Sequence, residues 1–461
     1  MFQIKAVIAP SVKESIALVA LIVAIVSASL IRFGAVPHIP ILIAILLLIG
    51  YGLVKRVPYV ELERGLVQGA GAGMSAVFLF FFIGILISAW MMSGTIPTLI
   101  YAGFSLITPL FFFAIVFIIT SIVGLSIGSS LTTVATVGVA FIGMASVLDV
   151  SLAITAGAIV SGAFFGDKMS PVSDTTNLAS SIVGVDLFVH IRNMGWTTIP
   201  AFLISLVIFA ILSPEAAATD AARIDAFQQG LLATGSIHWY AIIPLVVLIL
   251  MTIYKVPAMM TLAISSVVAI ALSYVHQIYP VSDVFSIIFS GYVSETGFAD
   301  VDALLSRGGM ESMFFTIGLV LLSLSMGGLL FTLGIVQTLL AKIENLLSKA
   351  GSVIAAAAMT AVGINVLIGE QYLSILLTGQ AFQGSFEKLG LTPKNLSRVM
   401  EDAGTVVNPL VPWSVCGIFI TTTLGVSTLS YLPFALFCLL SPILTVIFGY
   451  TGKTLTYRKA D

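Results

Sequence analysis

The sequence contains few charged residues. Asp, Glu, Lys and Arg together make up 9% of its 461 residues, whereas they make up roughly a quarter of an average soluble domain. The net charge of −2 gives no reason to expect a nucleic-acid partner. The sequence has four histidines and two cysteines, and both Cys416 and Cys438 lie in apolar segments. We therefore expect two small buried side chains there, and neither a disulfide nor a metal site.

Long apolar runs make up much of the sequence, and hydrophobic residues account for 59% of the chain. The runs are about 16–25 residues long, which is the reach of a membrane-spanning helix. They predict an all-α polytopic membrane protein. The first run, near 16–31, lacks a convincing cleavage site and is interpreted as a span. The connections near 214–236 and 281–308 are too short for a nucleotide-binding domain, which argues against an ATP-driven pump.

The runs fall into two halves with the same order of parts. Each half has about five predicted spans, a two-armed hairpin with a polar tip, and an amphipathic stretch between its second and third spans. The predicted spans of the first half lie near 16–31, 36–54, 74–93, 151–190 (interrupted) and 196–213, with a hairpin near 104–146 and an amphipathic stretch near 58–72. Those of the second half lie near 238–254, 257–276, 312–335, 398–425 (interrupted) and 430–450, with a hairpin near 351–386 and an amphipathic stretch near 281–307.

The two halves also share residue types at a fixed offset of 241 positions. Two pairs of positions are identical, Pro171 with Pro412 and Ser173 with Ser414. In two further pairs the residue differs: Asp167 falls on Asn408, and Ser129 falls on Glu370. Because five is an odd number of crossings, the second half is predicted to be inverted relative to the first. Inverted repeats whose broken helices meet near the midplane are typical of secondary transporters. We expect a first repeat over 1–213, a linker over 214–236 and a second repeat over 237–461.

The charges of the loops predict the orientation of the chain. If both termini are cytoplasmic, 15 of the 19 Lys and Arg residues lie on the cytoplasmic side, as the positive-inside rule requires. Hairpin arms that cross the membrane fully would give fourteen crossings in place of ten, with the same loop sides. We favour re-entrant hairpins, because polar, Gly-rich tips suit non-helical backbone that lines a cavity.

The segment 162–179 is the most informative part of the chain, because it places Asp167, Lys168 and Asp174 in apolar surroundings. A charge at membrane depth costs about 2.5–3.5 kcal/mol on insertion scales, so the segment is interpreted as a site. Pro171 should break the helix, because proline lacks an N–H and clashes with the preceding turn. The freed carbonyls and nearby side-chain oxygens suit a small hard cation such as Na⁺.

We predict that Asp174 and Glu370 are the principal ion- or proton-binding carboxylates, one in each half, and that Asp167 and Lys168 tune the first site. Further candidates lie beside the predicted tips and breaks and carry oxygen atoms: Ser129, Thr133, Asn177, Asn365, Asp402, Thr405 and Asn408. The predicted Na⁺ ligands are Asp174, Ser129, Asn177, Asn365 and Asn408. Na⁺ is expected as the transported or coupling ion, and no cofactor is expected.

Each of these features also has a structural explanation. Hydroxyl groups in membrane helices often bond only to the preceding turn. Lys168 is also explained as an internal cation that pairs with Asp167 or Asp174. Glu401 and Asp402 are also explained as solvated charges at the cytoplasmic end of their span.

Two stretches resemble the NhaC-type Na⁺/H⁺ antiporter family. They are SGAFFGDKMSPVSDTTNLAS, and SRVMEDAGTVVNPLVPWSVCGIFITTTLGVSTLSYLPFA together with GEQYLSILLTGQAF before it. The resemblance covers about 70–450. It implies a bacterial or archaeal inner-membrane carrier with two inverted repeats and paired hairpins, and related carriers are commonly homodimers. Some members of this family resemble malate/lactate exchangers, and others move amino acids with Na⁺.

Our leading hypothesis is a non-enzymatic Na⁺/H⁺ antiporter that expels Na⁺ by alternating access. The second hypothesis is a carrier of a small organic acid or amino acid coupled to Na⁺ or H⁺, in which Lys168 would meet the carboxylate of the solute. A membrane-embedded enzyme is less well supported, because the soluble domains of a phosphorylated cation pump are missing. A passive channel is less well supported, because two inverted halves with broken helices suit alternating access better.

Overall fold

The computed structural model describes residues 4–106, 110–213, 221–344 and 349–458, and the regular elements within these ranges are helices. Seven described helices are long and apolar enough to cross a membrane, or up to nine if each of two bent helix pairs is one span. The predicted all-α polytopic membrane fold is therefore confirmed. The inverted-repeat arrangement, its boundaries at 213 and 237 and the re-entrant hairpins stay predictions.

The first half begins with five helices and continues with a two-armed hairpin and an interrupted helix. Its elements are α1 (Val12–Phe33), α2 (His38–Val54), α3 (Tyr59–Ala72), α4 (Met74–Met92), α5 (Thr95–Leu106), α6 (Phe112–Ile127), α7 (Ser130–Thr133), η1 (Val134–Gly138), α8 (Val139–Val147), α9 (Leu152–Met169), α10 (Asp174–Ile182) and α11 (Leu187–Leu212). The first hairpin arm begins at Phe112 and not near 104, and part of the predicted start, 107–109, lies outside the described residues. Helix α11 begins before the predicted 196, because the Asp186 side chain caps it by accepting from the N–H groups of Phe188 and Val189.

The second half also contains a two-armed hairpin followed by an interrupted helix. Its elements, with those of the preceding linker, are α12 (Ala221–Ala233), η3 (Trp239–Ile242), α13 (Ile243–Ile253), α14 (Ala258–Ser273), α15 (Val281–Ser290), α16 (Ala299–Leu305), η4 (Glu311–Met313), α17 (Phe314–Thr332), α18 (Ile335–Glu344), α19 (Ala350–Ile368), α20 (Gln371–Lys388), α21 (Pro393–Met400), η5 (Glu401–Thr405), η6 (Asn408–Leu410), α22 (Val415–Leu424), α23 (Thr428–Tyr431), η7 (Leu432–Phe434) and α24 (Leu436–Thr451). The last predicted span, 430–450, is not one straight helix. Its two parts, Thr428–Phe434 and Leu436–Thr451, meet at a bend of 58°.

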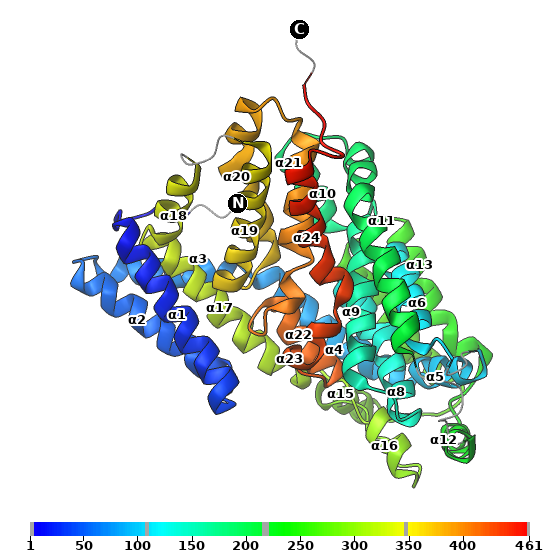
Figure 1. Ribbon diagram of the computed structural model, residues 1–461. Coiled ribbons are helices and arrows are strands. Elements are labelled where there is room, and N and C mark those ends of the chain that lie inside the picture. The colour runs from blue at the N-terminus through cyan, green and yellow to red at the C-terminus, as the bar shows by residue number, and fades with distance from the viewer. Residues whose placement is uncertain (1–3, 107–109, 214–220, 345–348, 459–461) are drawn as a thin grey trace.

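Glycine lets helices α6 and α9 approach closely. In the α6–α9 pair, a Cβ added at Gly162 would lie 2.0 Å from Thr120 Oγ1, and one at Gly166 would lie 2.3 Å from the backbone nitrogen of Leu125. Small residues allow such close packing between membrane helices. Helices α6, α9 and α11 consequently run side by side at one edge of the molecule, and α1 and α2 form the opposite edge (Figure 1).

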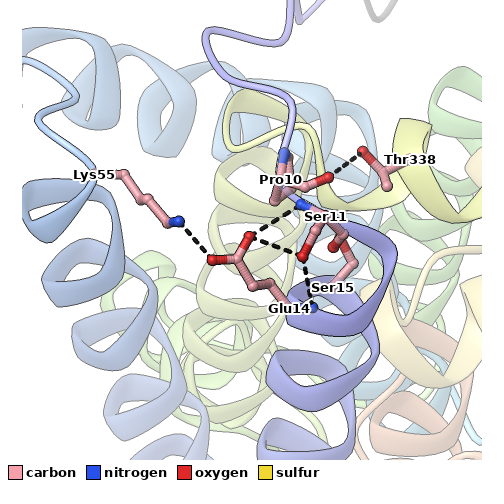
Figure 2. A network of polar contacts seen from close by, with 6 residues as sticks. All are labelled: Pro10, Ser11, Glu14, Ser15, Lys55 and Thr338. Atoms are coloured by element: carbon pink, nitrogen blue, oxygen red, sulfur yellow. Dashed lines mark hydrogen bonds and ion pairs between the residues drawn. The ribbon is translucent and has the colours of Figure 1, made fainter.

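The start of α1 is tied to two other elements (Figure 2). Ser11 and Glu14 form a capping box, in which each side chain accepts a hydrogen bond from the backbone N–H of the other residue. Lys55, at the end of α2, donates to Glu14 Oε1 at 2.5 Å, and Thr338 of α18 donates to the carbonyl of Pro10 at 3.3 Å. These contacts bring the start of α1, the end of α2 and α18 together.

Candidate functional site

Two hairpin tips have the same construction. Helix α6 ends at Gly128 and α19 ends at Gly369, and both glycines adopt positive φ values, of 66° and 75°. Ser129 then caps α7 by accepting from the N–H of Thr132. Glu370 caps α20 in the same way, because its Oε2 accepts from the N–H of Leu373 at 2.7 Å. The predicted tips are thus confirmed, and each carries a polar side chain at a helix N-terminus.

Each tip packs against the break in the following interrupted helix. A Cβ at Gly128 would lie 2.6 Å from Val172 Cγ2, in the break between α9 and α10. The carbonyl of Gly369 accepts from the N–H of Val415 at 2.8 Å, just after the break that precedes α22. The breaks at Pro171 and around Pro412 are where the sequence predicts them. Tips and breaks therefore meet in both halves.

The candidate carboxylates of the first half line a cavity of 290 Å³. Asp167 and Asp174 face it together with Ser129 and Asn177. Asp174 is exposed to this space, and Asp167 is buried in its wall, where its Oδ2 accepts from the Ser130 hydroxyl at 2.8 Å. Four predicted site residues are thereby brought together.

A larger cavity of 1440 Å³ shares Asp174 with the first and adds Glu370. Gln371 and Tyr372 also line both cavities, so the two spaces adjoin at the start of α20. Asp174 and Glu370, the two carboxylates predicted as principal, therefore face two adjoining cavities. Carboxylate and hydroxyl oxygens in these cavities are hard ligands that a cation or a proton can occupy.

Asn177 has a structural role in addition to facing the smaller cavity. Its Nδ2 donates to the carbonyls of Pro171 and Ser173, at 3.1 and 2.7 Å. The amide nitrogen of Asn177 therefore stabilises the backbone of the break, and its amide oxygen remains a candidate ligand.

Lys168 does not pair with Asp167 or Asp174. It forms a fully buried ion pair with Asp402, which lies 234 positions later in the chain. Thr197 Oγ1 donates to Asp402 Oδ1 at 3.1 Å, and Thr445 Oγ1 donates to Oδ2 at 2.6 Å. Lys168 lines neither cavity, so the structure gives it no direct contact with the first site. Asp402 and its neighbour Glu401 are both fully buried, and the interpretation of these residues as solvated charges is wrong.

Asn365 and Asn408, the predicted amide ligands of the second half, are hydrogen-bonded to each other. Asn365 Nδ2 donates to the carbonyl of Gly404 at 2.6 Å, and its Oδ1 accepts from Asn408 Nδ2 at 2.8 Å. Asn408 Oδ1 in turn accepts from the N–H of Cys416. These contacts hold the hairpin arm α19 to η5 and to the start of α22. Each amide oxygen therefore already accepts one hydrogen bond, and neither Asn365 nor Asn408 lines either cavity.

The remaining two candidates also lie away from the cavities. Thr133 Oγ1 donates to the carbonyl of Ser129 at 2.9 Å, the local bond that its structural explanation requires. Thr405 is fully buried in η5. Neither residue lines either cavity.

Sequence reasoning missed the donors that hold the carboxylates. Ser130 follows the predicted tip residue Ser129 directly, so its place was recoverable from the motif. Thr197 and Thr445 carry no local signal, because each lies in an otherwise apolar helix. Among the described residues, no group of three His, Cys, Asp or Glu side chains could hold a metal ion, and Cys416 and Cys438 are free and buried, as predicted.

Comparison with known proteins shows the family of the chain. The model of the Na⁺/H⁺ antiporter family matches residues 162–453. The chain is 41% identical to the Na⁺/H⁺ antiporter NhaC of Alkalihalophilus pseudofirmus over 94% of both chains. It is 37% identical to the Na⁺/H⁺ antiporter NhaC of Bacillus subtilis, over 90% of this chain and 93% of the relative. It is also 35% identical to the malate-2H⁺/Na⁺-lactate antiporter of Bacillus subtilis, over 87% and 86% of the two chains.

Proposed function

Because the chain belongs to the Na⁺/H⁺ antiporter family, we propose that it is a secondary active transporter that expels Na⁺ in exchange for protons by alternating access. The observation that carries this proposal is the pair of adjoining cavities at the hairpin tips and helix breaks. Asp167, Asp174 and Glu370 line them in a molecule that otherwise has few charges.

Competition for a carboxylate gives the exchange. A carboxylate that holds a proton is a poor ligand for Na⁺, and one that holds Na⁺ resists protonation. If Asp174 and Glu370 take either cation, but not both at once, each reorientation of the site carries one or the other. Ser129 and Asn177, at the smaller cavity, supply neutral oxygens to complete the shell of Na⁺. No covalent chemistry is needed.

Flux measurements on purified protein in liposomes test the assignment. Asp174→Asn and Glu370→Gln keep the shape of each side chain and remove its charge, and each should abolish Na⁺-driven proton flux. Glu387→Gln is the matched control, because Glu387 lies near the end of α20, the helix that Glu370 caps, but forms an exposed ion pair with Arg458. If both site variants retained the flux of the Glu387→Gln protein, the assignment would be wrong.

A second candidate function is transport of a small organic acid or amino acid with Na⁺ or H⁺. Its support is the larger cavity, which at 1440 Å³ far exceeds a bare cation and is lined by Gln68, Gln371, Gln380 and Gln383. The Bacillus relative named for malate and lactate exchange fits this alternative. Lys168 does not support it, because the lysine is bound to Asp402. Proton movement driven by Na⁺ alone favours the first function, whereas a requirement for an added solute favours the second.

We place the transporter in a bacterial cytoplasmic membrane with both termini in the cytoplasm, as the loop charges predict. We also propose that residues 1–213 and 237–461 are its two inverted repeats. The shared construction of the tips at Gly128 and Gly369 supports this division. A homodimer stays a prediction from the family resemblance.

A further inference from the structure

Glu401 has no role in the cavities, and its chemical setting is unusual. The residue is fully buried, and among the described residues its carboxylate meets one hydroxyl donor, that of Thr405, at a geometry outside the ordinary limits of a hydrogen bond. The carboxylate of its neighbour Asp402, equally buried, accepts hydrogen bonds from a lysine and two hydroxyls. An ionised carboxylate in the protein interior without donors is strongly destabilised, whereas its neutral acid is much less so. Burial with a single weak donor therefore favours the neutral, protonated form of Glu401.

The backbone around Glu401 is also irregular. Glu401–Thr405 form a single π-helical turn inside a broken span, and the N–H of Val406 reaches back to the carbonyl of Glu401 at 3.4 Å. Such π turns are rare and occur frequently at functional sites. The buried hydroxyl of Thr405, in the same turn, is the donor that faces the Glu401 carboxylate. The turn thus presents these oxygens to the protein interior.

A proton fits this place better than a metal cation does. The available oxygens are those of Glu401 and Thr405, which are too few to replace the hydration shell of Na⁺. The amide oxygen of Asn365 is taken by Asn408, and the Asp402 carboxylate is taken by Lys168. Lys168 also acts electrostatically on Glu401, and its positive charge opposes a second fixed cation nearby.

The other charged groups around Glu401 come from the helices that pack against η5, namely α9, α10, α19, α20, α21 and α24. Helix α19 carries no titratable side chain. The titratable or charged residues on the other elements, and on η5 itself, are Asp167, Lys168, Asp174, Tyr372, Glu387, Lys388, Lys394, Arg398, Asp402, Cys438 and Tyr450. Those that act electrostatically on Glu401 are Lys168, Asp167 and Asp402.

We propose that Glu401 is a second proton-binding site of the transport cycle, separate from the cavity carboxylates. It lines neither cavity, so its proton is occluded in the conformation described here. The proton leaves when the π turn moves and opens Glu401 to water, and the buried Lys168 favours the carboxylate that remains. This inference rests on the proposed exchange of Na⁺ for protons and adds a proton carrier to it.

The test compares wild type with Glu401→Gln, which has the shape of the neutral acid and cannot release a proton. We expect the variant to fold, to exchange radioactive Na⁺ for unlabelled Na⁺ across liposomes, and to move fewer protons per Na⁺ than wild type. Infrared difference spectra of the two purified proteins should show a carboxylic-acid C=O band in wild type alone, and that band should shift in deuterium oxide. Glu387→Gln, on the surface, should match wild type in every measurement.

Several results would overturn the inference. One is an unchanged proton-to-Na⁺ ratio in Glu401→Gln with the acid band present in wild type, which would make Glu401 a structural neutral acid. Another is weakened Na⁺ exchange at every pH, which would make it a cation ligand. If Glu401→Gln fails to fold, Glu401→Asp replaces it, and an unshifted pH profile of its proton flux would refute the role.

Wild-type protein that moves no protons in response to Na⁺ would refute the proposed exchange itself. The ratio of protons to solute is then measured with the solute that drives transport.

Discussion

At the scale of single residues, two of the ion pairs in the described part of the chain lie in opposite surroundings. Lys168 and Asp402 are fully buried, whereas Lys55 and Glu14 have side chains that are 37% and 39% exposed (Figure 2). Removal of one partner from a buried pair leaves an uncompensated charge, which costs about 3–5 kcal/mol. An exposed pair contributes about 0–1 kcal/mol, because water and salt screen it. The two lysines therefore form a matched comparison.

Lys168→Met should lower the melting temperature of the detergent-solubilised protein far more than Lys55→Met does. The double variant Lys168→Met, Asp402→Asn should recover part of the loss, because it removes the unpaired charge. Thermal unfolding of the four proteins, including wild type, measures both effects. Equal melting temperatures for the two lysine variants would contradict the buried pairing.

Asp302 gives a pH prediction outside the membrane spans. Its carboxylate accepts from the hydroxyls of Ser294 and Thr296 and from the N–H groups of Thr296 and Gly297. These hydrogen bonds hold the pKa of Asp302 below its usual value. A lowered folded-state pKa means that the stabilisation is complete above the unfolded-state pKa, about 3.9, and is lost as the pH falls through the folded-state value.

Hydrogen exchange at the amides of residues 294–297, corrected for the intrinsic pH dependence of the exchange rate, should therefore show constant protection from neutral pH down to about 4, and a loss below it. Asp302→Asn should show weakened protection already at neutral pH. Asp283→Asn, on neighbouring α15, is the control and should resemble wild type. Protection in Asp302→Asn that equals wild type at neutral pH would show that the carboxylate does not order this loop.

At the scale of elements, local chemistry made the tips and breaks predictable. Glycine ends α6 and α19 because the positive φ there costs it little, and Pro171 interrupts a helix because it lacks an N–H. Pairing across the chain was not predictable in this way. Lys168, near the end of α9, has two carboxylates closer to it in sequence, those of Asp167 and Asp174. Packing of α9 against η5 and α24 brings Asp402 to it instead. The early start of α11, in contrast, follows from a local signal, because Asp186 directly precedes the helix and caps it.

The close α6–α9 contact predicts that a glycine-to-alanine substitution destabilises the protein there but not at an open position of another helix. Gly166→Ala would place a Cβ 2.3 Å from the backbone of Leu125, and overpacking of this kind typically costs about 1–3 kcal/mol. Gly50→Ala, in α2, meets nothing within 4 Å, and alanine is favoured over glycine in a helix by up to about 1 kcal/mol. Melting temperatures should therefore fall for the first variant and hold or rise for the second.

The same contact carries function, because α6 leads to the tip at Ser129 and α9 carries Asp167. Gly166→Ala should consequently reduce Na⁺-driven proton flux in liposomes as well as stability, and Gly50→Ala should not. A Gly166→Ala protein with unchanged melting temperature would show that the two helices separate without cost.

At the scale of the whole molecule, the candidate site joins segments from both halves of the chain. Asp167 and Asp174 come from the first half and Glu370 from the second, and the adjoining cavities exist only where the two meet. An ion bound there contacts the folded protein and has no equivalent site in the unfolded chain. Binding should therefore stabilise the entire fold, by about 2.7 kcal/mol when the ion is at one hundred times its dissociation constant.

The melting temperature of the wild-type protein should therefore rise with NaCl when choline chloride keeps the ionic strength constant. Asp174→Asn and Glu370→Gln should lose this rise, and Glu387→Gln should keep it. The rise should also shrink as the pH is lowered, because protons then compete with Na⁺ for the same carboxylates. An equal rise with choline chloride alone would mean that ionic strength and not Na⁺ stabilises the protein. A full rise in both site variants would place Na⁺ away from the two cavities, and the exchange would then have to run through other residues.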